Sequence, residues 1–184
     1  MNCLNIVDFM HLILVGFMGS GKSTLGRRLS EQMSRPFIDM DSRIEENLGC
    51  SISEYVAEFG LEAFRIEESE LLRTIVKEPE SVIATGGGTP CADGAMDWMR
   101  KHGVVVHLSV PVPELAKRLK GNVANRPLLS KVKPDDFERV IGRHLLVRAS
   151  CYGNADVKWT EIEYTDDELT NRLSSIGWRL REAL

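Results

Sequence analysis

The chain has 184 residues, of which 43% are hydrophobic and 27% charged, so we expect one compact domain over residues 1–184 with a sizeable core. The formal net charge of -4 argues against a nucleic-acid partner held by bulk electrostatics, although it leaves room for local basic sites that bind small anions. No apolar run is long enough to cross a bilayer, so we expect no membrane partner and a cytoplasmic protein.

The cysteines and the N-terminus carry no sign of secretion. The cysteines are scattered and form no C-x-x-C pair: Cys3, Cys50, Cys91 and Cys151. We therefore expect no zinc site and no disulfide framework. We expect the cysteines to be reduced thiols. The first ten residues lack the basic leader and apolar core of a signal peptide. Because Met10 directly precedes the first predicted strand, we expect residues 1–9 to be a disordered extension or the product of an upstream start.

Short apolar runs alternate with amphipathic stretches along the chain. Strands are predicted at 11–15, 36–38, 81–84, 103–108 and 157–162. Helices are predicted at 22–34, 42–48, 51–59, 61–76, 95–102, 112–119, 135–152 and 166–180. Residues 120–134 are polar and without periodicity, which predicts a mobile surface segment. The alternation predicts an α/β fold with a parallel sheet covered on both faces, in which ligands bind outside the carboxyl ends of the strands.

The segment after the first strand has the pattern of a phosphate-binding loop. Residues 16–24 read Gly-Phe-Met-Gly-Ser-Gly-Lys-Ser-Thr and match G-x-x-x-x-G-K-[ST]. In such a loop, backbone N–H groups and a helix N-terminus bind phosphate oxygens, Lys22 reaches the terminal phosphates, and Ser23 offers a hydroxyl to Mg²⁺. The alternative is a glycine-rich turn with an incidental lysine, but the strand before and the helix after favour a nucleotide site. The predicted ATP-binding residues are Gly19, Ser20, Gly21, Lys22, Ser23 and Thr24.

Two acidic residues, Asp39 and Asp41, follow the second predicted strand. Asp39 is placed to supply the carboxylate that Mg²⁺ needs. Asp41 is placed to hold an acceptor hydroxyl and accept its proton. The alternative is a turn with a helix cap, since Asp caps helices well. Beside a phosphate loop the functional interpretation is preferred.

An arginine and a triple glycine lie near the same predicted edge. Arg65 follows Phe64 near a helix start and could bind a carboxylate through its planar guanidinium. On spacing alone, an ordinary ion pair with Glu62 or Glu68 is the preferred explanation. Gly86, Gly87 and Gly88 follow the third strand. Ordering three glycines costs much chain entropy, so close approach of a ligand to the backbone is preferred over a simple turn.

The neighbouring residues in the sequence do not by themselves assign a role to two further arginines. Arg126, followed by Pro127, lies in the polar segment, where it is either a solvated loop residue or a lid residue that closes over the γ-phosphate. Arg148 lies on the next predicted helix, four residues before Tyr152.

Taken together, these motifs resemble those of the shikimate kinase family in order and rough spacing. The resemblance runs from residue 10 to about 177. It implies a three-layer P-loop fold with a five-stranded parallel sheet of order 2-3-1-4-5, flanked by helices, and a mobile lid at about 120–134. It implies Mg²⁺-dependent transfer of the γ-phosphate of ATP to the 3-hydroxyl of shikimate, a step of aromatic amino-acid biosynthesis, by a cytoplasmic monomer.

The resemblance also implies a role for each candidate residue. Lys22, Asp41 and Arg126 are the implied catalytic residues, with Asp41 binding the ring hydroxyls and orienting or deprotonating the attacking one. The implied substrate-binding residues are Asp41, Arg65, Gly86, Gly87, Gly88 and Arg148, with the two arginines holding the carboxylate. Ser23 and Asp39 are the implied metal ligands, and Arg118 and Arg126 the implied ATP-binding arginines.

The chain departs from the family pattern after Gly60. The family usually has Glu there, whereas this chain has Leu61 followed by Glu62. The adenine-contacting loop, near Thr165 and Asp166, is not assigned by the sequence. Two other functions remain open on the sequence alone. One is a different small-molecule kinase of this fold, such as a gluconate kinase or a nucleotide kinase, and the other is a non-catalytic ATP-binding regulatory module.

Overall fold

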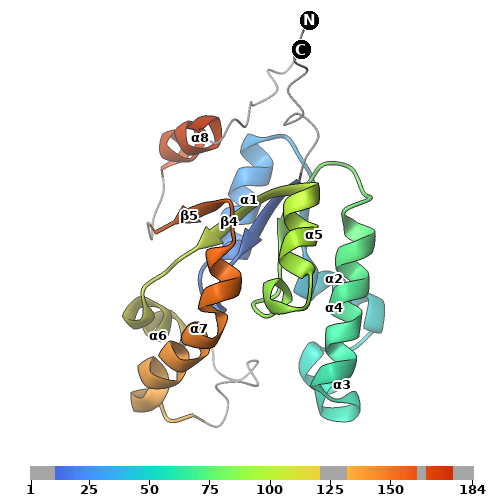
Figure 1. Ribbon diagram of the computed structural model, residues 1–184, viewed down its shortest axis with the longest axis vertical. Coiled ribbons are helices and arrows are strands. Elements are labelled where there is room, and N and C mark those ends of the chain that lie inside the picture. Colours follow the sequence, from blue (N-terminus) through green and yellow to red (C-terminus); the bar gives the residue numbers. More distant parts are fainter. Residues whose placement is uncertain (1–10, 121–131, 161–164, 176–184) are drawn as a thin grey trace, which may run out of the picture.

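The computed structural model describes residues 11–120, 132–160 and 165–175 (Figure 1). The predicted extension at 1–9 and most of the predicted lid, including Arg126, lie outside these residues. Among the described helices, none is long and apolar enough to cross a membrane.

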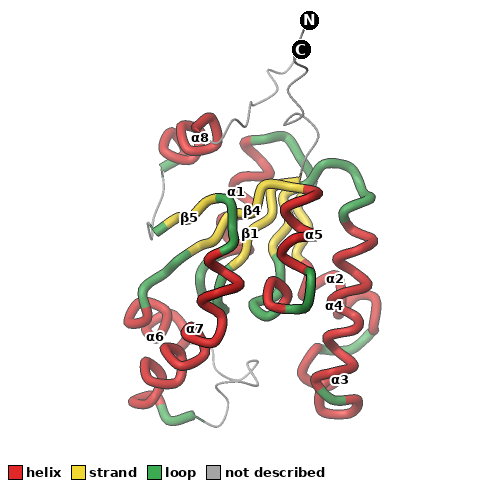
Figure 2. The backbone as a smooth tube through the Cα atoms, in the orientation of Figure 1, coloured by secondary structure: helices red, strands yellow, loops and turns green. Residues whose placement is uncertain are grey.

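A parallel sheet of five strands forms the centre of the fold (Figure 2). The strands are β1 (His11–Val15), β2 (Phe37–Asp39), β3 (Val82–Ala84), β4 (Gly103–Leu108) and β5 (Val157–Trp159). Their order is β2-β3-β1-β4-β5, with every neighbouring pair parallel, which confirms the predicted order. Because β1 lies in the middle of the sheet, its residues are all buried, in keeping with an apolar run that does not alternate.

Helices cover both faces of the sheet (Figure 1). They are α1 (Lys22–Gln32), α2 (Met40–Leu48), α3 (Ile52–Phe59), α4 (Leu61–Ile75), α5 (Ala95–His102), α6 (Val112–Lys120), α7 (Phe137–Gly153) and α8 (Asp166–Ser175). Successive strand residues point to opposite faces. Leu12 and Leu14 therefore pack in a core with α1 and α8, whereas Ile13 and Val15 pack in a second core with α2, α4 and α5. A third cluster joins α6 and α7 around Phe17.

Local signals in the sequence account for several helix ends. Ser51 and Glu54 form a capping box at the start of α3, as the spacing Ser-x-x-Glu predicts. Gly49 ends α2 in the left-handed conformation, with φ of 69°. Helix α2 begins at Met40, earlier than predicted, because the Asp39 side chain accepts from the backbone N–H groups of Asp41 and Ser42.

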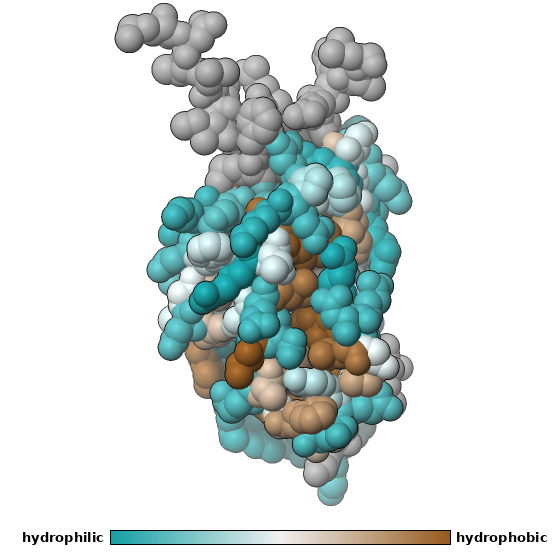
Figure 3. Space-filling model, turned by 90° about the vertical axis from the view of Figure 1, so that its right-hand side faces the viewer, coloured by the Kyte–Doolittle hydropathy of each residue, from teal (hydrophilic) through white to brown (hydrophobic). Residues whose placement is uncertain are grey.

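Polar residues dominate the side of the molecule seen in Figure 3, where they surround a hollowed strip of hydrophobic residues. Helices α3 and α4 carry three large hydrophobic side chains that are more than half exposed: Phe59, Leu61 and Ile66. Leu61 is the residue that departs from the family pattern. Its side chain is 51% exposed at the start of α4.

The expectation that all cysteines are reduced is wrong for one pair. Cys91 and Cys151 form a disulfide, with their Cα atoms 5.3 Å apart. The two residues are separated by 60 positions in the sequence, and only the packing of the 3₁₀ turn Thr89–Cys91 against α7 brings them together. No local spacing carries that information. Cys50 is a free cysteine.

Candidate active site

The carboxyl ends of three adjacent strands bring the predicted site segments together. The phosphate loop follows β1, the two acidic residues lie at the end of β2, and the triple glycine follows β3. Thr85 fastens the glycine segment to the end of β1, because both its backbone N–H and its hydroxyl donate to Leu14 O at 3.1 Å. At Gly87, an added Cβ would lie 3.4 Å from Met18 N in the phosphate loop. The glycine segment therefore lies against that loop.

The phosphate loop is closed by two basic side chains. Lys22 Nζ donates to Gly16 O at 2.9 Å and to Phe17 O at 3.2 Å, so its ammonium group folds over the loop. Arg118, on α6, donates to Gly19 O at 3.3 Å, and its Nε pairs with Glu114 at 2.8 Å. Arg118 thus lies beside the loop, where the resemblance to the family places an ATP-binding arginine.

The glycines of this loop supply a backbone shape that other residues rarely adopt. Gly16, Gly19 and Gly21 have φ of 149°, 78° and 95°. Gly21 directly precedes Lys22, the first residue of α1. The loop and the N-terminal end of α1 therefore form the type of site that binds phosphate.

Ser23 and Asp39 meet where the predicted metal site lies. The Ser23 hydroxyl donates to Asp39 Oδ2 at 2.5 Å. The other carboxylate oxygen of Asp39 accepts from the first turn of α2, so one side chain both caps a helix and faces the phosphate loop. Both groups are oxygen ligands of the kind that Mg²⁺ prefers, and they fit an ion that also binds phosphate and water.

Asp41 is a carboxyl group with a strongly raised pKa. Surrounding protein atoms partly desolvate the carboxyl group and raise its pKa from 3.8 to about 6, with smaller raising effects from Asp39, Glu68 and Glu45. The positive charge of Lys22 acts in the opposite direction. The residue is nevertheless exposed to solvent. A carboxyl group with this pKa can exist as a base near neutral pH.

Arg65 is held by a buried carboxylate. Its Nη1 pairs with Oε2 of Glu68, one turn further along α4, and Glu68 is only 2% exposed. The other oxygen, Glu68 Oε1, accepts from the Thr89 hydroxyl at 2.7 Å. The guanidinium of Arg65 also lies directly against Gly88, where an added Cβ would contact it. The ion pair at helical spacing that the sequence allowed is therefore present, and it fixes Arg65 at the glycine segment.

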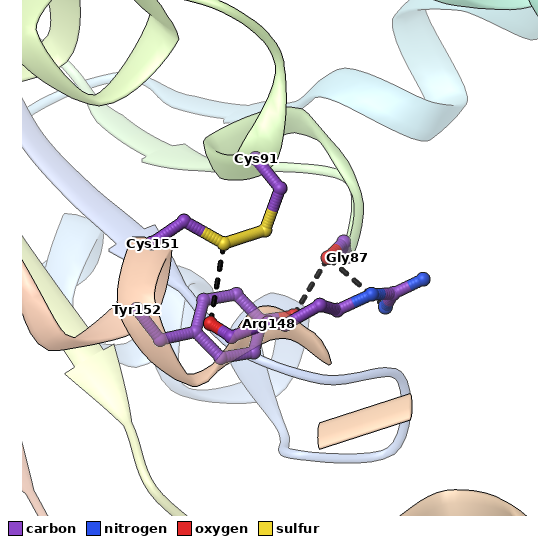
Figure 4. Close-up of a disulfide and its surroundings, with 5 residues drawn as sticks. All are labelled: Gly87, Cys91, Arg148, Cys151 and Tyr152. Carbon is purple, nitrogen blue, oxygen red and sulfur yellow. Dashed lines mark hydrogen bonds between the residues drawn. A yellow bond between two sulfur atoms is a disulfide. The ribbon is translucent and has the colours of Figure 1, made fainter. Parts of the chain in front are cut away.

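Arg148 reaches the same segment from α7 (Figure 4). Its Nη1 donates to Gly87 O at 3.2 Å, and its guanidinium lies over the Phe17 ring at 5.3 Å from the centroid. The Tyr152 hydroxyl donates to the same carbonyl oxygen at 2.6 Å. The two arginines of the predicted carboxylate site therefore approach neighbouring glycines from different helices.

Tyr152 is suited to act as a hydrogen-bond donor. Burial raises the pKa of its phenol, so the hydroxyl keeps its proton at neutral pH. Its ring packs against His107 of β4, with 4.8 Å between the ring centroids. Burial and the charges of Lys158 and Lys22 lower the pKa of His107 to about 4, so the imidazole is neutral. The contact between His107 and Tyr152 thus brings no extra charge next to Arg148.

Sequence reasoning gave no role in the site to three of its residues, Glu68, Thr89 and Tyr152, although it named Glu68 as a possible partner of Arg65 and noted Tyr152 beside Arg148. Glu68 and Tyr152 lie at helical spacing from Arg65 and Arg148, and Thr89 directly follows the triple glycine. Thr165, near the unassigned adenine loop, caps α8 by exchanging hydrogen bonds with Glu168. Arg126 lies outside the described residues.

Comparisons with known proteins agree with this geometry. A sequence model of the family "Shikimate kinase" matches residues 18–175. The chain is 36% identical over 171 residues to a shikimate kinase of Chlorobium chlorochromatii, covering 88% of this chain and 90% of that protein. It is 37% identical over 146 residues to a shikimate kinase of Parabacteroides distasonis, covering 79% and 84%.

The chain belongs to the shikimate kinase family. Solved structures of the family agree in fold. A crystal structure of shikimate kinase from Bacteroides thetaiotaomicron matches with a TM-score of 0.85 and 30% identity, covering 92% of this chain and 99% of that one. Shikimate kinase from Acinetobacter baumannii in complex with shikimate matches with a TM-score of 0.83 and 29% identity, covering 95% and 97%. Family membership makes the chain an ATP-dependent kinase and favours neither the gluconate-kinase-like function nor the regulatory module.

Proposed function

We propose that this chain transfers the γ-phosphoryl group of ATP to the 3-hydroxyl of shikimate. One observation carries the proposal: residues 86–88 bring Asp41, Arg65 and Arg148 together beside a phosphate loop. This set of groups suits a small acceptor that has both a carboxylate and ring hydroxyls. The complex of the Acinetobacter relative with shikimate supports the same acceptor.

On the acceptor side, the two arginines bind the carboxylate and the acidic residue binds the hydroxyl. Guanidinium groups form charge-assisted hydrogen bonds with carboxylates, and Arg65 and Arg148 approach from two directions. With a pKa of about 6, Asp41 is mostly ionised at neutral pH and can accept the proton of the attacking hydroxyl. Gly86, Gly87 and Gly88 let the acceptor approach the backbone.

On the phosphate side, the chain supplies positive charge and position. Lys22 and the N–H groups of Gly19 to Thr24 bind the phosphates, Arg118 binds on the nucleotide side, and Arg126 closes over the transferred group. Ser23 and Asp39 would hold Mg²⁺, with Asp39 reaching it through water. When bound, Mg²⁺ neutralises charge on the phosphate oxygens. We place the protein in the cytoplasm, as a monomer without a nucleic-acid or membrane partner.

The test is ADP release from ATP and Mg²⁺ with shikimate, run beside gluconate and the nucleoside monophosphates. We expect turnover with shikimate alone. Lys22→Ala should abolish turnover and leave the circular dichroism spectrum unchanged. Turnover on another acceptor would refute the proposed substrate, and ATP binding without turnover on any acceptor would refute the proposed reaction.

Arg148→Ala tests the carboxylate site more directly than a change at Arg65, because Arg148 contacts the Gly87 carbonyl oxygen and the Phe17 ring, whereas Arg65 is paired with Glu68. Loss of one partner of a desolvated charge pair costs about 2–5 kcal/mol, so the shikimate KM should rise by about 30-fold or more. The ATP KM should change by less than about twofold, since the substitution leaves the phosphate loop intact. Arg143→Ala is the matched control, an exposed arginine on the same helix. Equal effects of Arg148→Ala on both substrates would contradict the assignment.

A further inference from the structure

A disulfide joins the two elements that form the carboxylate side of the proposed site. Cys91 ends the 3₁₀ turn that follows the triple glycine. Cys151 lies on α7 between Arg148 and Tyr152. Figure 4 shows the disulfide beside the two hydrogen bonds that α7 makes to Gly87. The covalent bond and these hydrogen bonds therefore attach the same helix to the same segment.

Apart from the disulfide, two hydrogen bonds to one carbonyl oxygen link α7 directly to the glycine segment. Gly87 O accepts from Tyr152 Oη at 2.6 Å and from Arg148 Nη1 at 3.2 Å. Water competes for such hydrogen bonds, so each one stabilises a given geometry only modestly. A covalent bond to the adjacent turn restricts the helix whether or not the hydrogen bonds are formed. The oxidised form therefore holds Arg148 in place more firmly than the reduced form does.

The disulfide joins two residues that are not enclosed in the core. Cys91 is exposed and Cys151 is half-buried, whereas a structural disulfide is commonly enclosed in a core. Cys151 Sγ lies 3.2 Å from Arg148 O. A sulfur atom in a disulfide carries no proton, so this contact is a hydrogen bond only in the reduced form, where the thiol donates to the helix carbonyl. Reduction thus leaves Cys151 with a partner inside α7 and removes its bond to the turn.

We propose that Cys91 and Cys151 form a redox-active pair whose oxidation state sets the affinity of the site for the carboxylate of the acceptor. The inference rests on the proposed function, because it takes Arg148 to bind that carboxylate. In the oxidised form the guanidinium is held beside Gly87 and is ready to bind. In the reduced form α7 keeps its packing against α6 and β4 but is no longer bonded to the turn, so the acceptor must fix Arg148 as it binds, which lowers its affinity.

The redox step is thiol–disulfide exchange with a low-molecular-weight disulfide. The thiolate of the exposed Cys91 attacks one sulfur of that disulfide and forms a mixed disulfide, while the other sulfur leaves as a small thiol. The thiolate of Cys151 then attacks the Cys91 sulfur, forms the protein disulfide and releases the second small thiol. Two protein thiols are oxidised and one small disulfide is reduced to two thiols. A dithiol reductant reverses the step.

The experiment compares the full chain after incubation with dithiothreitol, which reduces the pair, and with oxidised glutathione, which supplies the low-molecular-weight disulfide. The chain has four cysteines, so thiol titration should find four thiols in the reduced form and two in the oxidised form. Peptide mapping should find the Cys91–Cys151 cross-link in the oxidised form. The shikimate KM should be about three- to tenfold lower in the oxidised form, and the ATP KM should change by less than about twofold.

Two variants separate this role from a purely structural one. The double variant Cys91→Ser with Cys151→Ser should show the higher, reduced-form shikimate KM under both conditions. Cys50→Ser, which changes a cysteine outside the pair, should keep the full difference between the two forms. If the disulfide only stabilises the fold, its reduction should lower the melting temperature, and the shikimate KM should be the same in the oxidised and reduced forms.

Three outcomes would overturn the inference, and they are distinguishable. Four free thiols after oxidation would show that the disulfide does not form. Equal shikimate KM values in two forms that differ by two thiols would show that the pair does not act on the site, and would leave the proposed function intact. No turnover with shikimate in either form would overturn the proposed function, and the inference with it.

Discussion

Replacing Glu68 with glutamine tests the buried charge pair that fixes one arginine of the site. Glu68 is 2% exposed, and its two carboxylate oxygens bind Arg65 and the Thr89 hydroxyl. Glutamine has nearly the same shape and can still accept from Thr89 through its oxygen. Its amide nitrogen cannot accept a hydrogen bond from Arg65. The substitution therefore removes one charge-assisted interaction and leaves the neighbouring one.

The size of the effect follows from the exposure of the two partners. A hydrogen bond to a charged group contributes about 1.5–3 kcal/mol, and more when both partners are buried. The Arg65 side chain is 31% exposed, so water replaces part of the lost interaction. We therefore take the lower end and expect the free energy of unfolding to fall by about 1.5 kcal/mol. If holding Arg65 favours substrate binding by a similar amount, the shikimate KM rises about tenfold.

Urea denaturation measures the change in the free energy of unfolding, and coupled ADP release measures both KM values. Glu70→Gln is the matched control, because Glu70 is an exposed residue of the same helix, and it should leave both measurements unchanged. A loss of stability with an unchanged shikimate KM would refute the positioning role of Glu68. An equal rise in the ATP KM would show general damage to the site instead.

Three further changes test other parts of the structure. Asp41 has a pKa of about 6, so turnover at low shikimate should rise as the pH rises through about 6 and level off above about 7, and Asp41→Asn should abolish this dependence together with most activity. Because the pKa of Asp41 is raised in the folded state, ionisation of Asp41 disfavours folding, and the free energy of unfolding should decrease as the pH rises from 3.8 to about 6. Urea denaturation across this range should show the decrease in the wild type, and Asp41→Asn should lack the part that is due to Asp41. Gly86→Ala would place a Cβ 2.9 Å from both Asp41 Oδ1 and Thr89 Oγ1, so kcat should fall about tenfold or more while ATP binding, measured by calorimetry, stays unchanged. Ser51→Ala removes the capping box of α3 and should lower the free energy of unfolding by about 1 kcal/mol in urea without changing turnover.

Much of the fold could be predicted because its signals are local. Strand β4 and helix α5 begin and end at the predicted residues, since a β-branched run and an amphipathic run meet at Gly103. The order of the strands came from the resemblance to the family, because neither hydrophobic periodicity nor capping residues determine which strands pair. The sequence predicts that α2 begins at residue 42, two residues later than it does, because a helix cap at Asp39 and a functional role for Asp39 are treated as alternatives. The structure shows one side chain with both contacts.

The contacts between distant segments could not be predicted. Glu68 reads as one of several glutamates on a helix, and its burial depends on Thr89 arriving from the segment after β3. The pairing of Cys91 with Cys151 likewise depends on how the 3₁₀ turn packs on α7. Helical spacing shows that Glu68 can reach Arg65, but the spacing does not distinguish an exposed pair from a buried one. That distinction decides whether the pair fixes the arginine.

The triple glycine explains why these charged groups can meet. The sequence suggested that a ligand approaches the backbone there, and a positive φ is not the reason for glycine at any of the three positions. An added Cβ would contact Glu68 and Asp41 at Gly86, lie 3.5 Å from Arg148 Nη1 at Gly87, and contact the guanidinium of Arg65 at Gly88. Gly86 and Gly88 thus make room for charged side chains of the protein, whereas a Cβ at Gly87 would lie at an ordinary contact distance from Arg148. Asp41 is a carboxyl group at this edge that combines a raised pKa with access to solvent, as a base for the acceptor hydroxyl requires.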